Sequence, residues 1–120
     1  MIMSKDIFRD KSFKFAVRIV KTYRFLVEEK KEYVLSKQLL RSGTAVGALH
    51  REAEQAESKA DFIHKMAIAQ KECNESIYWI ELLYATDYFD KNQFDSINND
   101  AIELLKICTA VITSSKKTIK

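Results

Sequence analysis

Apolar residues recur every three or four positions along most of this chain, which is the period of an amphipathic α-helix. Four segments with this period follow one another. We predict helices over about residues 12–30, 34–57, 59–86 and 93–117. Because short connections make successive helices antiparallel, the pattern predicts an all-α fold, an antiparallel up-down-up-down four-helix bundle.

Capping residues indicate where these helices begin. Ser12 precedes the first periodic segment and Ser58 precedes the third. Serine is a favoured N-cap because its hydroxyl accepts a hydrogen bond from an otherwise unpaired backbone N–H. Asp61, three residues after Ser58, is its predicted capping-box partner. This reading places residues 1–11 in an N-terminal extension and residues 12–118 in a single bundle domain.

The first predicted helix has one apolar face and one basic face. Six apolar residues fall in one arc of the helix: Ala16, Ile19, Val20, Tyr23, Leu26 and Val27. The opposite arc holds Lys14, Arg18, Lys21 and Arg24. Cations spaced along one helix face can follow a phosphate backbone, so these four residues form a candidate nucleic-acid-binding face. An ordinary solvated surface is the alternative.

The third predicted helix is apolar on two sides. One side carries Phe62, Met66, Ala69, Cys73, Ile77, Ile80 and Tyr84, which is sufficient for a bundle core. A second stripe, nearly opposite, carries Ile68, Tyr78, Trp79 and Leu82. A helix that is apolar on two sides is usually covered on two sides. We therefore expect another subunit to provide the second cover.

The chain has two glycines, Gly43 and Gly47, and no proline. Both glycines lie inside the second predicted helix, where glycine costs about 0.5–1 kcal/mol relative to alanine. Small residues surround them. We therefore predict that the two glycines form a close-packing seam against another helix, either inside the bundle or between subunits.

The composition is that of a folded protein, with 47% hydrophobic and 31% charged residues in a chain of 120. No apolar run approaches the roughly 20 residues that span a bilayer, and the N-terminus lacks a signal-peptide core. We expect a cytoplasmic protein without membrane contact. Cys73 and Cys108 lie in apolar helical stretches and are expected to be buried free thiols.

Charge is distributed unevenly, although the net charge is only +3. Residues 1–31 hold nine Lys or Arg and four Asp or Glu, whereas residues 58–90 hold three Lys or Arg and six Asp or Glu. The start of the chain is therefore basic and its middle acidic. If several copies assemble, their basic faces combine into a larger positive surface.

Eight polar and aromatic residues of the second and third helices form a predicted structural network or interface: Arg41, Ser42, Glu52, Lys71, Glu72, Glu75, Tyr78 and Trp79. Lys71 and Glu75 are four residues apart and can pair along one helix. Arg41 lies beside the glycine seam and can cross to Glu72 or Glu75. The alternative is a set of separate surface salt bridges, each worth about 0–1 kcal/mol.

Few residues are available for catalysis or metal binding. A di-metal carboxylate bundle requires two Glu-x-x-His pairs, whereas the two histidines of this chain belong to the pairs His50–Glu54 and Asp61–His64. We interpret both as solvated surface pairs. The sequence has no phosphate-binding loop. We predict no enzyme activity, no catalytic residue, no metal and no cofactor; a cleft built from Arg41, Lys71, Glu72 and Glu75 is the remaining alternative for an enzyme.

Residues 38–83 resemble the four-helix-bundle proteins encoded in intervening sequences of bacterial 23S ribosomal RNA genes, a family often labelled S23 ribosomal protein. The likeness rests on an R-S-G-T-x-x-G-A motif at residues 41–48 and a Y-W-x-x-L-L motif at residues 78–83. The chain departs from the family pattern at Leu49, where asparagine is usual, and at Ser76, where threonine is usual.

This resemblance implies a homopentameric barrel around a central channel. It also implies kinship with the accessory variability determinant of diversity-generating retroelements, which binds nucleic acid and associates with a reverse transcriptase. Our first hypothesis is a non-enzymatic oligomeric scaffold that binds RNA or DNA through its basic faces. The second is a protein-interaction module, with a partner such as a reverse transcriptase, that has no nucleic-acid binding of its own.

Overall fold

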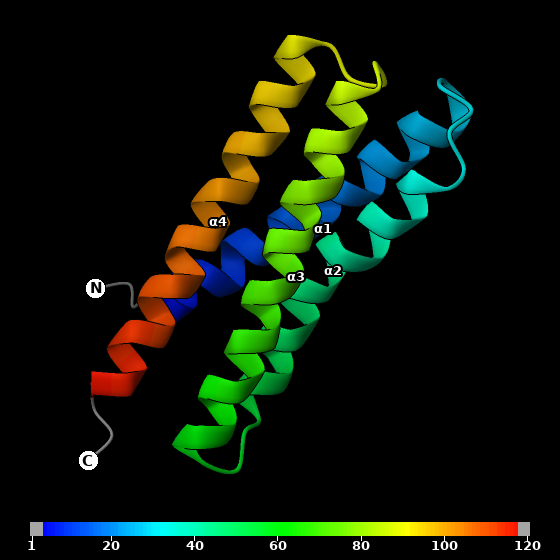
Figure 1. Cartoon of the computed structure of the whole chain (residues 1–120). Helices are drawn as coiled ribbons and strands as arrows, with labels where there is room; N and C mark the ends of the chain where they lie inside the picture. The colour runs from blue at the N-terminus through cyan, green and yellow to red at the C-terminus, as the bar shows by residue number, and fades with distance from the viewer. Residues whose placement is uncertain (1–3, 118–120) are drawn as a thin grey trace.

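Four antiparallel helices form a bundle in the computed structural model of the protein (Figure 1). The structure describes residues 4–117. Helix α1 spans Ser4–Glu28, α2 spans Leu35–Glu54, α3 spans Lys59–Ala85 and α4 spans Lys91–Lys117. The α1–α2 and α3–α4 connections lie at one end of the bundle and the α2–α3 connection at the other. The predicted all-α, up-down-up-down four-helix bundle is confirmed.

Each helix packs on two neighbours, since α1 and α3 both contact α2 and α4. The contact between α1 and α4 is the least extensive of the four. None of the helices within residues 4–117 contains an apolar stretch that could span a bilayer.

The first helix begins earlier than the sequence pattern predicts. Helix α1 starts at Ser4, so residues 4–11 belong to the bundle and not to an extension. Ser12 is not an N-cap; its side chain is buried inside α1 and donates a hydrogen bond of 3.2 Å to the Arg9 carbonyl. Phe8 is fully buried in the core and explains why the helix extends this far. Residues 1–3 and 118–120 lie outside the described structure.

Side-chain caps define the starts of the other helices. The Ser58 hydroxyl accepts a hydrogen bond of 3.0 Å from the Asp61 N–H, as predicted for α3. Helix α4 begins at Lys91, two residues before its predicted start at Gln93. The reason is a capping box, in which Asp90 and Gln93 each accept a hydrogen bond from the other's backbone N–H at 2.8 and 2.9 Å.

The start of α2 is held by a carboxylate that the sequence pattern did not single out. Glu32 accepts hydrogen bonds from the backbone N–H groups of Val34, Leu35 and Ser36, at 3.2, 3.1 and 2.7 Å. Burial acts to raise the pKa of Glu32, but these hydrogen bonds outweigh it and lower the pKa below its ordinary value.

One core runs through the bundle. The fully buried residues of α1 in this core are Phe8, Phe15, Ile19 and Leu26. The buried face of this helix is therefore displaced from the predicted apolar arc, because it includes the rings of Phe8 and Phe15. Four residues of the predicted arc are only half-buried: Ala16, Val20, Tyr23 and Val27. The predicted core residues of α3 are confirmed at Met66, Ala69, Cys73 and Ile80.

Candidate functional site

The glycine seam lies inside the bundle, between α2 and α1. A Cβ atom added to Gly43 would be 2.7–3.0 Å from three side-chain atoms of Ile19, which is too close for any side chain. A Cβ atom added to Gly47 would be 3.4 Å from the carbonyl and hydroxyl oxygens of Ser12, near the edge of normal contact. Both glycines therefore lie against α1 of the same chain, which is one of the two places that the sequence left open for the seam.

The predicted link from Arg41 to α3 is present. The Arg41 guanidinium lies 3.0 Å from a Glu72 carboxylate oxygen and also pairs with the Glu75 carboxylate. The indole N–H of Trp79 donates a hydrogen bond of 3.1 Å to Glu75. Half of the Arg41 side chain is exposed, so solvent screens these ion pairs and each contributes about 0–1 kcal/mol.

Two buried serines lie beneath this ion-pair network. The hydroxyl of Ser76 is 2.9 Å from the hydroxyl oxygen of Ser42 and 2.9 Å from the Glu72 carbonyl oxygen. Both serines are fully buried, so each polar group needs a partner inside the protein. This contact therefore favours one alignment of α2 against α3.

Two members of the predicted network lie apart from it. Within residues 4–117, the exposed Lys71 side chain makes no ion pair, and the predicted pair with Glu75 is wrong because Glu75 faces Arg41. Glu52 pairs instead with Lys65, at 3.2 Å. Lys71 therefore does not join the ion pairs that link Arg41 to Glu72 and Glu75.

The predicted basic face of α1 is partly neutralised within the chain. Arg18 turns toward α4, where its guanidinium binds the Asp100 carboxylate at 2.7 Å. Lys14 pairs with Asp10 at 3.0 Å along α1 itself. Lys21 and Arg24 are exposed, and neither side chain makes an ion pair or hydrogen bond with the residues that the structure describes. These two are therefore the cations of the face that are available to a partner.

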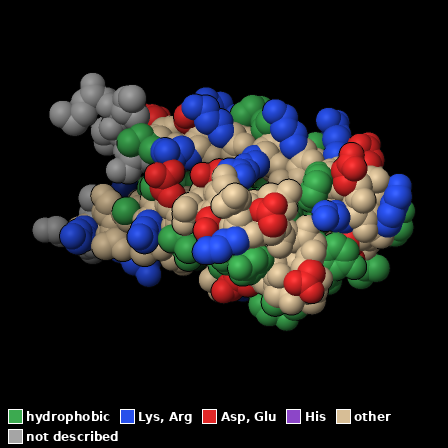
Figure 2. Space-filling view, turned by 90° about the horizontal axis from the view of Figure 1, so that it is seen from above, with side chains coloured by type: hydrophobic (Ala, Val, Ile, Leu, Met, Phe, Trp, Pro, Cys, Tyr) green, Lys and Arg blue, Asp and Glu red, His purple; other side chains and the backbone are tan. Residues whose placement is uncertain are grey.

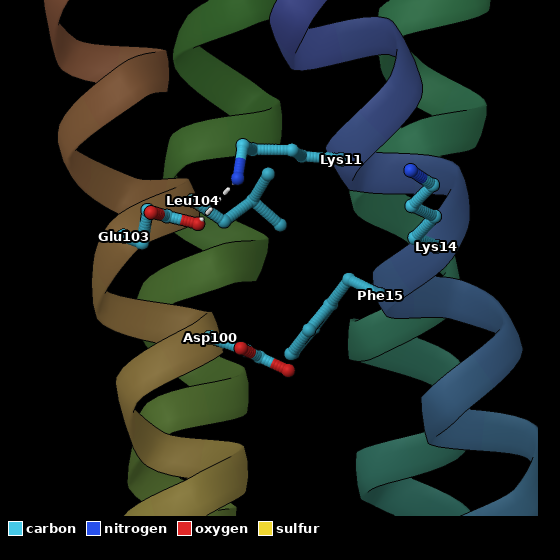
Figure 3. Close-up of a pocket in the computed structure, with 6 residues that line it drawn as sticks. All are labelled: Lys11, Lys14, Phe15, Asp100, Glu103 and Leu104. Atoms are coloured by element: carbon cyan, nitrogen blue, oxygen red, sulfur yellow. Dashed lines mark hydrogen bonds and ion pairs between the residues drawn. The ribbon is translucent and has the colours of Figure 1, made fainter.

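A charged pocket of about 170 Å3 lies between α1 and α4 (Figure 3). Lys11, Lys14 and Phe15 line it from α1, and Asp100, Glu103 and Leu104 line it from α4. The Lys11 ammonium bridges to the Glu103 carboxylate at 2.8 Å, and this hydrogen bond raises the pKa of Lys11. Cations and carboxylates balance across the pocket. We interpret it as part of the contact that joins α1 to α4.

Large apolar side chains reach the surface in several places. The most exposed are Phe13, Val17, Tyr33, Val34 and Tyr78, at 58%, 41%, 52%, 70% and 56% of their full area. Figure 2, a view of the end with the α1–α2 and α3–α4 connections, shows hydrophobic side chains between charged ones. The outer face of α1 is therefore mixed and not purely basic, since it includes Phe13 and Val17.

The second apolar stripe predicted on α3 is only partly uncovered. Tyr78 is exposed, whereas Ile68, Trp79 and Leu82 are half-buried. The rings of Tyr78 and Trp79 pack edge to face, with their centroids 5.0 Å apart.

An open hollow of about 250 Å3 lies between α1 and α2. Eight residues line it: Arg9, Ser12, Phe13, Ala16, Thr44, Gly47, Ala48 and Arg51. The Arg51 guanidinium carbon lies 5.9 Å from the centroid of the Phe13 ring, within range of a cation–π contact. Most of the lining is apolar or small. This hollow was not predicted, because it depends on which residues of two helices meet.

His50 is buried in the core, and its prediction as a solvated surface residue is wrong. Its exposed fraction is 1%, and its ring packs edge-on against Phe8, with the centroids 5.0 Å apart. Nδ1 lies 3.5 Å from the sulfur of Met66, and Nε2 has no hydrogen-bond partner among the described residues. The carboxylate of Glu54 is 3.9 Å from Nε2 and pairs with Arg9 at 3.3 Å. His50 lies four residues after the buried Val46, and this helical spacing is the signal of burial that the sequence prediction missed.

Comparison with known proteins identifies the family. The profile of the 23S rRNA-intervening sequence protein matches residues 5–110, which is most of the chain. The chain belongs to this family. It is also similar to a crystal structure from Bacteroides thetaiotaomicron VPI-5482, a protein of unknown function from the S23 ribosomal protein family. That structure is 56% identical in sequence, with a TM-score of 0.91, and the match covers 92% of this chain and 99% of the other.

Among curated proteins, none matches the chain. The family resemblance stated from the sequence is confirmed.

The two departures of this family member from the usual pattern both lie against the core. Leu49 packs on the buried cluster as a partly buried apolar residue. Ser76 keeps the hydroxyl that threonine would supply, and this hydroxyl makes the buried contact with Ser42. The structure therefore explains Ser76 as a replacement that retains the polar group.

The thiols and carboxylates of this family member do not gather into a reactive site. Cys73 and Cys108 are free and buried, as predicted, and burial raises the pKa of each thiol to about 12. Such thiols stay protonated and weakly nucleophilic at neutral pH. Within residues 4–117, no group of three or more His, Cys, Asp or Glu residues is placed to bind a metal ion.

Stability is expected to fall in mild acid because of His50. Burial lowers the pKa of His50 below 6.5, although Glu54 acts to raise it and the nearby Arg9 and Arg51 to lower it further. The folded protein therefore binds fewer protons than the unfolded chain just below pH 6.5. The contribution of neutral His50 to the free energy of unfolding is therefore fully present above this pH. It is lost as the pH falls toward the folded pKa, by up to about 1.4 kcal/mol per pH unit.

Urea unfolding at a series of pH values between 7 and 5 measures this effect, and His50→Leu is expected to remove the slope that His50 contributes. The exposed His64 provides the control, because His64→Leu should retain that slope. A slope that His50→Leu leaves unchanged would contradict the prediction.

Proposed function

We propose that this chain is a non-enzymatic, cytoplasmic scaffold that assembles as a homopentamer and binds RNA through the outer face of α1. The observation that carries the proposal is the exposure of large apolar side chains on separate helices, Phe13 and Val17 on α1 and Tyr78 on α3. Aromatic side chains such as those of Phe13 and Tyr78 are enriched at contact surfaces between proteins. The subunit number follows the family resemblance of residues 38–83.

Light scattering over a range of protein concentrations tests the assembly. We expect a mass five times the 14.0 kDa of one chain. A chain that remains monomeric at millimolar concentration would contradict the scaffold.

Two cations support the RNA-binding part of the proposal. Lys21 and Arg24 project from α1 into solvent without partners in the described structure, and each copy in an assembly adds such a pair. Phosphate contacts of this kind are independent of sequence and depend strongly on salt. The family description, which refers to 23S rRNA, makes RNA the first nucleic acid to test.

The charge reversals Lys21→Glu and Arg24→Glu, made together, are expected to weaken RNA binding, because two phosphates are no longer neutralised by the protein. Each phosphate contact of single-stranded RNA contributes about 0.7 to the slope of log affinity against log salt, so the slope should decrease by roughly 1.4. Fluorescence anisotropy with a labelled single-stranded RNA over several salt concentrations measures it. Arg18 is a poorer choice, because its replacement would also break the contact with Asp100.

Lys106→Glu with Lys116→Glu is the matched control, since it makes the same change in net charge at exposed positions of α4. The control is expected to leave the salt slope within experimental error of the wild-type value. The RNA-binding part fails if the wild-type protein does not bind at low salt, or if both pairs of substitutions have the same effect.

A protein partner, such as a reverse transcriptase, is the second candidate. The observation that favours it is the exposure of Tyr33 and Val34 side by side in the α1–α2 connection. A complex of this kind should survive nuclease treatment and high salt, and Val34→Ser with Tyr33→Ser should abolish it. Loss of the complex on nuclease treatment would instead indicate that RNA links the two proteins.

A further inference from the structure

The hollow between α1 and α2 is concave and open to solvent. Thr44, Gly47 and Ala48 line it from α2 with short side chains, and the exposed ring of Phe13 lines it from α1. Its volume is about 250 Å3. A cavity of about 150 Å3 already accepts a benzene ring. The hollow therefore has room for an aromatic side chain.

Tyr78 is an exposed aromatic side chain on a different part of the surface, on α3. More than half of its area is accessible, although its ring packs edge-on against Trp79. This contact restrains the ring before any partner arrives, so little conformational freedom is lost on binding. Tyrosine is also among the residues that contribute most at the centres of protein interfaces.

Each of the two surfaces has one exposed charged side chain without an ion pair in the described structure, and these two charges are opposite in sign. Arg51 borders the hollow and makes no ion pair within residues 4–117. The part of α3 that carries Tyr78, residues 72–85, has three glutamates and no Lys or Arg, but Glu72 and Glu75 are paired with Arg41 of α2. One of them, Glu81, lies about one turn after Tyr78 and is exposed, without an ion pair in the described structure. The free carboxylate of Glu81 beside Tyr78 thus complements the arginine at the hollow.

We propose that Tyr78 of one copy inserts into the α1–α2 hollow of a second copy of this chain. The inference rests on the proposed self-assembly and specifies its interface. The contact is heterologous, because it joins two different surfaces. After the first contact, each dimer still has one free Tyr78 and one free hollow, so further copies add head to tail until a ring closes.

Two single substitutions test this interface. Tyr78→Ala removes the inserted ring, and Ala48→Glu fills the hollow with a longer acidic side chain that would meet Glu81. Both positions are exposed, so the fold should be retained, which far-UV circular dichroism checks. Each variant is expected to raise the concentration of half-assembly by about 30-fold or more, the effect of removing a hot-spot side chain.

Ala110→Glu is the matched control for Ala48→Glu, because it makes the same substitution at an exposed position of α4. Tyr78→Phe is the matched control for Tyr78→Ala, because it retains the ring. Both controls are expected to assemble as the wild-type protein does, when the masses are measured by analytical ultracentrifugation.

Mixing the two variants separates this contact from any other. The Ala48→Glu chain keeps its Tyr78 and the Tyr78→Ala chain keeps its hollow, so an equimolar mixture should form a heterodimer with twice the mass of one chain. A mixture that stays monomeric overturns the proposal, and so does assembly that neither variant weakens. A wild-type chain that never assembles contradicts the proposed scaffold itself, and it is recognised without any substitution.

Discussion

Phe8→Ala is expected to lower the free energy of unfolding by about 3–5 kcal/mol, the largest effect of any single substitution considered for this protein. Phe8 is fully buried and its ring packs edge-on against His50. Truncation removes the burial of an aromatic ring and leaves a cavity whose walls, on two helices, cannot collapse completely. Small domains are stable by only about 5–15 kcal/mol, so the loss is a large fraction of the total.

Urea unfolding followed by circular dichroism measures this change, and Phe13→Ala is the matched control. Phe13 is also a phenylalanine of α1 but is mostly exposed, so its replacement in the same dilute solution should cost less than about 1 kcal/mol. Equal effects of the two substitutions would show that the first turns of α1 do not pack on the bundle.

Gly43→Val has the second largest expected effect, a loss of about 2–3 kcal/mol in the free energy of unfolding. The Cβ atom alone would lie 2.7 Å from a side-chain atom of Ile19, and valine adds two further methyl groups. Ile19 is fully buried and β-branched, so its side chain has few rotamers in which to move away. The better helix propensity of valine recovers only a few tenths of a kcal/mol.

Gly47 offers the control for Gly43, because it lies four residues further along the same seam. A Cβ atom there would be 3.4 Å from Ser12, so Gly47→Ala is expected to be neutral or to stabilise by up to about 1 kcal/mol through helix propensity. In a double-mutant cycle, Ile19→Ala should offset part of the loss from Gly43→Val. Wild-type stability of Gly43→Val would contradict close packing at this position.

The start of one helix could be predicted from the sequence, and the start of another could not. The N-terminus of α3 could be predicted because the Ser58 hydroxyl caps the Asp61 N–H locally, within one turn. The start of α1 could not, because the reason for its length is the burial of Phe8 against His50, a residue far along the chain. His50 itself was misplaced, since a histidine beside a glutamate on a helix is usually solvated, and only the contact with α1 made it part of the core.

The candidate surfaces also depend partly on local sequence and partly on contacts between helices. The charge pattern placed four cations on one face of α1, but Arg18 pairs with Asp100 on α4 and Lys14 pairs with Asp10, which leaves Lys21 and Arg24 without ion pairs in the described structure. Pairing across helices depends on side-chain reach and on which helices become neighbours. A one-dimensional pattern does not contain this information.

The sequence by itself determined the helical period, the antiparallel bundle and the family, because periodicity and short connections act locally and the family motifs are contiguous in the chain. The tertiary structure decided which groups face one another. It placed Gly43 against Ile19, buried the imidazole of His50, and formed a hollow beside Phe13. The physical reason is that burial and close contact are properties of pairs of helices, and no single segment specifies them.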